Sequence, residues 1–131
     1  MGDAGSGFLG IILGCLSIQA AWAGSEYFFA WLIMLGVFVV DATFTLTRRL
    51  VRGDKVYEAH RSHAYQFASR AYGSHKRVTL AVTGINLVWL LPIAMSVGLH
   101  HLDGALGLVL AYIPLVALAF KYKAGQLEAS A

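Results

Sequence analysis

The sequence predicts an all-α integral membrane protein, with four transmembrane helices and a basic cytoplasmic loop between the second and the third. Two observations support this fold class. Of the 131 residues, 58% are hydrophobic and only 13% are charged, whereas about 25% are charged in an ordinary soluble domain. Eight of the ten Lys and Arg lie within residues 48–77, and the other two are Lys121 and Lys123. An apolar excess of this size has to face lipid, and basic residues gathered in this way indicate a membrane topology.

Four apolar segments are the candidate transmembrane helices of a single membrane domain that spans residues 1–131. In chain order they cover residues 7–23, 27–46, 78–97 and 102–120. A helix needs about 20 mostly apolar residues to cross a bilayer. The second and third segments therefore have the required length, and the first and fourth are slightly short.

Short polar turns separate the two segments of each pair. Residues 23–26 form the first turn, and the second contains His100, His101, Asp103 and Gly104. We expect the side chains of the two histidines to be solvated. Neither turn contains Lys or Arg, whereas the central loop and the C-terminus hold all ten. The positive-inside rule therefore predicts that this loop and both termini are cytoplasmic.

Composition argues against two further features. Cys15 is the only cysteine, so an internal disulfide is excluded, and a single thiol in an apolar run is expected to be a small buried hydrophobe. Residues 8–46 contain no Lys or Arg, so we expect no nucleic-acid partner.

A few residues interrupt the apolar spans. Pro92 and Pro114 lie within the third and fourth segments, and a kink is expected at each, because proline removes one helical hydrogen bond. Gln19 and Asn86 are expected to form hydrogen bonds between neighbouring helices.

Asp41 lies inside the second segment, two turns before Arg48. An ionisable residue at such a position is a functional candidate, because its burial in lipid is costly. With the hydroxyls of Thr43, Thr45 and Thr47 it is expected to form a polar track at the cytoplasmic end of the helix. The alternatives are a structural hydrogen bond to a neighbouring helix and, more remotely, a small transporter built around Asp41.

The central loop, residues 48–77, is predicted to contain a short amphipathic helix at the membrane surface. Asp54 is the candidate N-cap and Gly73 the candidate C-terminal stop, and Ser74 could cap the third span. Between the first two, apolar and small residues recur near helical spacing at Tyr57, Ala64, Ala68 and Ala71.

Asp3 is the first candidate site residue, since it lies in the glycine-rich stretch MGDAGSG immediately before the first span. Backbone amides at a helix N-terminus face anions, and a carboxylate there can hold a cation that bridges phosphate oxygens. This arrangement suits a magnesium and phosphate site. The alternative is an N-cap aspartate in a frayed terminus.

The second candidate is the cluster His60, Arg61, Ser62 and His63. Arg61 is suited to bind phosphate oxygens with two parallel hydrogen bonds, and the histidines can donate hydrogen bonds to a diphosphate. Two histidines three residues apart without a third ligand are poor evidence for zinc. The alternative is a solvated basic loop that touches anionic lipid headgroups. An even number of predicted spans lies between the two candidates, so both are expected on the cytoplasmic side of the membrane. There they could share one site that joins a soluble phosphate compound to a lipid phosphate.

Two stretches resemble a known family. Residues 1–10 read MGDAGSGFLG, and residues 41–66 contain DATFTLTRR followed by YEAHRSHAYQ. These motifs resemble those of the polyprenyl-phosphate N-acetylhexosamine-1-phosphate transferases, in the branch that initiates O-antigen synthesis. The similarity continues through GSH at residues 73–75 and VT at residues 78–79, and it covers essentially the whole chain.

The resemblance implies a reaction and a set of site residues. The family transfers an N-acetylated amino-sugar 1-phosphate from a UDP-sugar to undecaprenyl phosphate, releases UMP, requires Mg²⁺ and works in the bacterial inner membrane. This step initiates lipid-linked O-antigen or cell-surface polysaccharide synthesis. By position, Asp3 matches the magnesium ligand, and His60 and His63 match the catalytic histidines. The substrate-binding positions are Gly5, Ser6, Arg61 and Ser62.

One departure from the family pattern matters. The family carries a paired-aspartate motif and an asparagine/aspartate motif on earlier cytoplasmic loops, whereas no two of the seven acidic residues here are adjacent. The sequence therefore resembles a C-terminal fragment in which Met1 matches an internal methionine, and we expect no transfer by this chain alone. The implied partners are a UDP-N-acetyl amino sugar, undecaprenyl phosphate, the lipid bilayer, and either a missing N-terminal half or a second copy. The alternative is a non-enzymatic four-span membrane protein, as a remnant or as a complementing subunit of a split enzyme.

Overall fold

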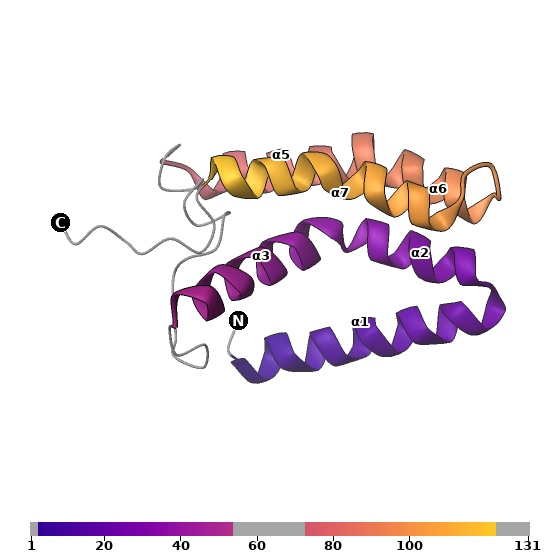
Figure 1. Ribbon diagram of the computed structural model, residues 1–131, viewed down its shortest axis with the longest axis horizontal. Coiled ribbons are helices and arrows are strands. Elements are labelled where there is room, and N and C mark those ends of the chain that lie inside the picture. Colours follow the sequence, from indigo (N-terminus) through magenta and orange to yellow (C-terminus); the bar gives the residue numbers. More distant parts are fainter. Residues whose placement is uncertain (1–2, 54–72, 123–131) are drawn as a thin grey trace.

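The computed structural model describes residues 3–53 and 73–122, and within these ranges it contains only helices and short turns (Figure 1). The all-α prediction is therefore confirmed for this part of the chain. The helices in chain order are α1 (Asp3–Ala23), α2 (Ser25–Met34), α3 (Gly36–Arg52), α5 (His75–Ile85), the π-helical segment η1 (Asn86–Leu90), α6 (Leu91–Gly98) and α7 (Gly104–Lys121). The predicted loop helix, with Asp54 as its N-cap, lies outside the described residues.

Within residues 3–53 and 73–122, three helical stretches are long and apolar enough to cross a membrane, and there are four if a bent pair counts as one span. The three are Ala4–Ala23, His75–Gly98 and Gly104–Lys121. The bent pair consists of α2 and α3. The helices end where the polar turns were predicted, because α1 ends just before Gly24 and α7 begins just after Asp103.

The second predicted segment is divided into two helices by a sharp bend. The axes of α2 and α3 differ by 70° across Leu35, which the apolar run of residues 27–46 did not predict. In a continuous helix the Leu32 carbonyl would accept from the backbone N–H four residues later. Here it accepts a hydrogen bond of 2.8 Å from the hydroxyl of Tyr112 on α7. The bend is therefore stabilised by a helix from the far end of the sequence.

The bond from Tyr112 gives a testable expectation. Tyr112→Phe removes the hydroxyl that donates to Leu32, and hydrogen bonds between membrane helices contribute about 1 kcal/mol. We expect a loss of that size in the free energy of unfolding, measured in mixed detergent micelles. Tyr27→Phe is the matched control, since Tyr27 lies at the surface of α2 with 42% of its side chain exposed. An equal effect of both substitutions would contradict the role of the Tyr112 hydroxyl.

The third span contains a π-helical segment that ends at Leu90, two residues before Pro92. Proline has no backbone N–H, and a wider turn of this kind is a common way for a helix to adapt. The Asn86 side chain donates to the Val82 carbonyl at 3.0 Å, within its own helix. This bond differs from the interhelical one that we predicted for Asn86. The helix α7 continues through Pro114 without a break.

The buried core lies where α2, α6 and α7 meet. Its largest fully buried apolar side chains are Ile33 on α2, Leu90 at the end of η1 and Val97 on α6. The helix α1 packs mainly against α2, and only 6% of the residues in its most apolar stretch are buried. Phe8 and Trp22 on α1 are 66% and 87% exposed. Apolar surface of this extent is typical of contact with lipid or with another protein.

Two local predictions need correction. Cys15 is exposed on α1, so the expected burial of its thiol is wrong, because α1 has few neighbours to cover it. Ser74 directly precedes the first residue of α5, as expected of a cap, but its side chain makes no capping hydrogen bond. Gly53 and Gly73 both have positive φ, 79° and 61°, a conformation that glycine adopts without strain.

Candidate functional site at the basic end

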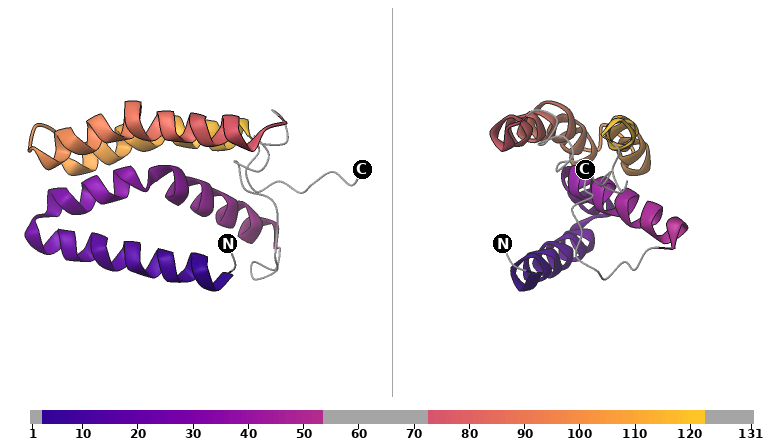
Figure 2. Two further views of the ribbon diagram at one scale, coloured as in Figure 1. Left: turned by 180° about the vertical axis from the view of Figure 1, so that it is seen from behind. Right: turned by 90° about the vertical axis from the view of Figure 1, so that its left-hand side faces the viewer.

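Four helix termini lie at one end of the molecule. The start of α1, the end of α3, the start of α5 and the end of α7 are all on the left in Figure 1, and the reversed view in Figure 2 agrees. Residues 54–72, which contain the cluster His60, Arg61, Ser62 and His63, connect two of these termini. That cluster itself lies outside the described residues. The structure nevertheless brings the glycine-rich start of the chain to the end at which this connection begins and ends.

Asp3 is the first residue of α1, so the helix begins four residues earlier than the predicted start at residue 7. Asp3, Gly5 and Ser6 therefore share the first helical turn, where backbone N–H groups lack partners within the helix. Gly5 is partly buried and Ser6 is exposed. This position is consistent with amides that could face an anion.

Basic side chains gather at this end. Among the described residues, every Lys and Arg lies in the last turns of α3, the first turn of α5 or the last turn of α7: Arg48, Arg49, Arg52, Lys76, Arg77 and Lys121. The turns at the opposite end contain Glu26, His100, His101 and Asp103. The charge asymmetry noted in the sequence therefore becomes an asymmetry between the two ends of the bundle.

An arginine held by aromatic rings lies where α3 and α7 end together. The Arg48 Cζ atom is 4.7 Å from the ring centroid of Phe44 and 5.3 Å from that of Phe120. The two rings meet edge to face, with centroids 4.6 Å apart. The spacing of four residues between Phe44 and Arg48 could have indicated their contact on one helix. The part played by Phe120 could not be found in the sequence.

The predicted polar track on α3 is only partly correct. Thr45 is buried at 1% exposure, and its hydroxyl has no hydrogen-bond partner within the described residues. Thr43 and Thr47 are exposed, and the Thr47 hydroxyl donates to the Thr43 carbonyl at 2.8 Å. Residues two apart point to different sides of a helix, so these two threonines cannot share one face with Thr45. Asp41 is partly buried.

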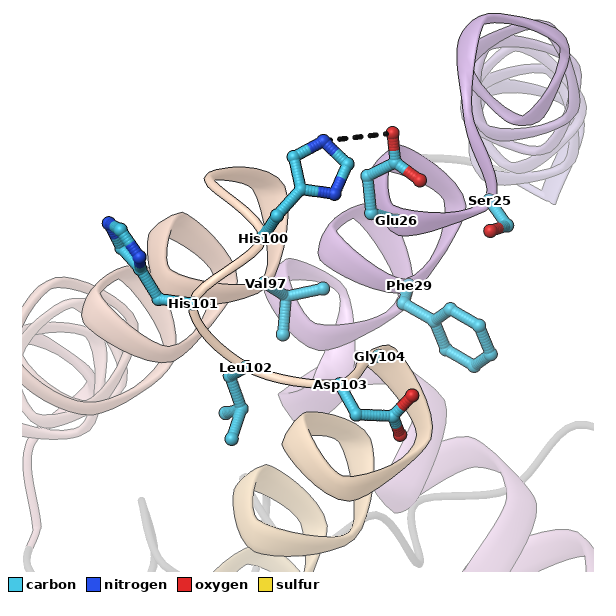
Figure 3. A pocket seen from close by; sticks show the side chains of 9 residues that line it. All are labelled: Ser25, Glu26, Phe29, Val97, His100, His101, Leu102, Asp103 and Gly104. Atoms are coloured by element: carbon cyan, nitrogen blue, oxygen red, sulfur yellow. Dashed lines mark ion pairs between the residues drawn. The ribbon is translucent and has the colours of Figure 1, made fainter.

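At the opposite end an open hollow of about 310 Å³ lies between the two polar turns (Figure 3). The His100 imidazole faces the Glu26 carboxylate across it, with Nε2 and Oε1 3.5 Å apart. His100 is exposed, as predicted for this turn, and adopts a positive φ of 59°. The Asp103 carboxylate caps α7 by accepting from the Leu106 N–H at 3.0 Å. These polar contacts connect the two helical hairpins or cap a helix.

No group of three or more His, Cys, Asp or Glu that could hold a metal ion occurs among the described residues. Magnesium in phosphate-binding sites commonly uses one or two protein carboxylates together with phosphate oxygens and water. A single carboxylate such as that of Asp3 is compatible with this chemistry, and its role as a magnesium ligand stays a prediction.

Comparisons with protein-family models, with curated proteins and with solved structures find no match for this chain. The resemblance described above therefore rests on the sequence motifs alone, and the roles of Asp3, Gly5, Ser6 and residues 60–63 stay predictions.

Proposed function

We propose that the chain forms part of a membrane transferase that moves an N-acetylated amino-sugar 1-phosphate from a UDP-sugar to undecaprenyl phosphate. The observation that carries this proposal is the position of Asp3, in the first turn of α1 at the same end as the termini that flank residues 54–72. A water-soluble sugar nucleotide and a lipid phosphate can meet only at a membrane surface. A site for both therefore belongs at one end of a set of apolar helices.

The proposed setting is the bacterial inner membrane, with the basic end and both chain termini in the cytoplasm. The positive-inside rule supports this orientation, because all the described Lys and Arg lie at that end. The turns that contain Glu26 and His100 would then face the outside.

In this proposal each predicted residue has a distinct task. The amides near Gly5 and Ser6, with Arg61 and Ser62, bind phosphate oxygens. His60 and His63 donate hydrogen bonds to the diphosphate and stabilise the charge on the departing UMP. Mg²⁺, held in part by Asp3, would neutralise negative charge on the diphosphate. Further carboxylates for this ion would have to come from another segment or chain.

Binding of a sugar nucleotide tests the proposal. The chain is reconstituted in lipid nanodiscs, and UDP-N-acetylglucosamine is titrated with Mg²⁺ present, with heat as the readout. We expect Asp3→Ala and His63→Ala each to weaken binding by about tenfold or more, because each removes a charge-assisted contact to phosphate or metal. Release of UMP is not expected from the chain alone.

Asp103→Asn is the matched control, since Asp103 caps α7 at the opposite end and asparagine is an equally good N-cap. Its affinity for the nucleotide should equal that of the unmodified chain. If the unmodified chain does not bind the sugar nucleotide, or if all three variants bind it equally well, the non-enzymatic alternative becomes the better explanation.

A further inference from the structure

The arginine-aromatic cluster at the ends of α3 and α7 consists of Arg48, Phe44 and Phe120, and it lies outside the set of residues predicted for the transferase site. The rings of Phe44 and Phe120 both contact the Arg48 guanidinium, with centroid distances of 4.7 Å and 5.3 Å. Cation–π contact with two rings restricts the positions that the guanidinium can take. The edge of such a group matches two oxygens of one phosphate.

The surface around this cluster is apolar on the helix side and basic on the end side. Leu46 and Leu50 on α3 are 46% and 58% exposed, and Phe120 on α7 is 58% exposed. Arg52 and Lys121 follow at the ends of the same two helices. An anionic lipid is complementary to this surface, because its apolar acyl chains lie next to a negatively charged phosphate group.

The charge balance favours an anion here. Residues 41–52 together with Lys121 contain Arg48, Arg49, Arg52 and Lys121, against the single carboxylate of Asp41. This excess of positive charge persists whichever hydrogen bonds these side chains make within the protein. Basic residues at a membrane surface attract anionic lipids with a free energy that corresponds to about a fivefold gain in affinity for each residue.

We propose that the Arg48–Phe44–Phe120 cluster binds the phosphate of an anionic bilayer phospholipid, with the acyl chains against the exposed leucines of α3 and the ring of Phe120. The inference rests on the membrane placement in the proposed function, and on no step of the transfer reaction. The lipid would stabilise the packing of α3 against α7 at the surface of the bilayer.

The test compares lipids retained by the purified chain. The protein is kept in detergent that contains equal amounts of phosphatidylglycerol and phosphatidylcholine, without nucleotide or Mg²⁺. Native mass spectrometry then measures which of the two lipids stays bound to the protein. We expect phosphatidylglycerol to be preferred, and Arg48→Gln to reduce the preference by about tenfold or more, because it removes charge-assisted hydrogen bonds to the phosphate in addition to one surface charge. Phe120→Leu keeps every charge and removes one ring, so it should reduce the preference by about twofold to fivefold.

Arg77→Gln is the matched control, because it removes the same charge from the same end of the molecule, on α5. It should reduce the preference by at most about fivefold, the effect of one surface charge, since no aromatic cluster orients Arg77 among the described contacts. Equal losses in Arg48→Gln and Arg77→Gln would show bulk electrostatic attraction and overturn the proposal. The absence of any preference for phosphatidylglycerol would also overturn it.

Two competition experiments separate the sources of phosphate. Inorganic phosphate should not displace the lipid, because it lacks the acyl chains that contact α3 and α7. Displacement by inorganic phosphate would reassign the cluster to soluble anions, and displacement by equimolar undecaprenyl phosphate would reassign it to the lipid substrate. Failure of the lipid test leaves the nucleotide-binding test untouched, since the two use different residues and different ligands.

Discussion

Gly107→Leu is expected to lower the free energy of unfolding by about 3 kcal/mol, at the upper end of the range for overpacked cores. Gly107 is buried on α7, where this helix meets α6 and α2. A Cβ atom at this position would lie 2.5 Å from Val97 Cγ2 and 3.4 Å from Ile33 Cδ1. Both neighbours are fully buried, so neither side chain has space into which it could move.

The measurement is unfolding in mixed detergent micelles, followed by far-ultraviolet circular dichroism. Gly10→Leu makes the same chemical change on α1, where no atom lies within 4 Å of the added Cβ. This control should keep or slightly increase the stability, because leucine favours a helix more than glycine does. If both variants lost the same amount of stability, close packing at Gly107 would not be the cause.

Gly36→Leu is expected to cost about 1–3 kcal/mol and to change the angle between α2 and α3. Gly36 begins α3 directly after the bend, and a Cβ there would lie 3.0 Å from Leu115 Cδ1 and 3.1 Å from Tyr112 Cε1. The added side chain therefore has to push α3 away from α7, which also moves the Tyr112 hydroxyl relative to the Leu32 carbonyl.

The bend itself can be followed with spin labels at exposed positions on α1 and α3. We expect the distance distribution to shift or broaden in Gly36→Leu, and to stay unchanged in Gly84→Leu. Gly84 lies on α5, and a Cβ there has no atom within 4 Å. An unaltered distribution in Gly36→Leu would mean that contact at Gly36 does not set the angle.

The helices themselves were largely predictable from the sequence, because apolar runs, glycines and polar turns are local signals. The bend between α2 and α3 was not predictable in this way. Residues 25–52 contain no proline, and the bend depends on a small residue at Gly36 and a hydroxyl at Tyr112. These two residues come into contact only when the two hairpins pack together, so no local sequence pattern connects them.

The candidate site was predictable to a similar extent. Because two predicted spans lie between Asp3 and the central loop, both were expected on the same side of the membrane. The corresponding helix termini do lie at one end of the molecule. The grouping of Thr45 with Thr43 and Thr47 failed, because alternate residues do not share a helix face. The Arg48 cluster needs Phe120, which follows Arg48 by two spans. Contacts of that kind depend on tertiary packing that no local pattern specifies.

The bond between Tyr112 and Leu32 also has a consequence for biosynthesis. The two residues are separated by 80 positions, and a ribosome that adds about 5–20 residues per second needs roughly 4–16 s to cover that distance. During this interval α2 and α3 have already been synthesised, while the hydroxyl that stabilises their bend does not yet exist. The bend can therefore gain this hydrogen bond only after α7 has been translated, so the second span reaches its final set of contacts only when the last helix arrives.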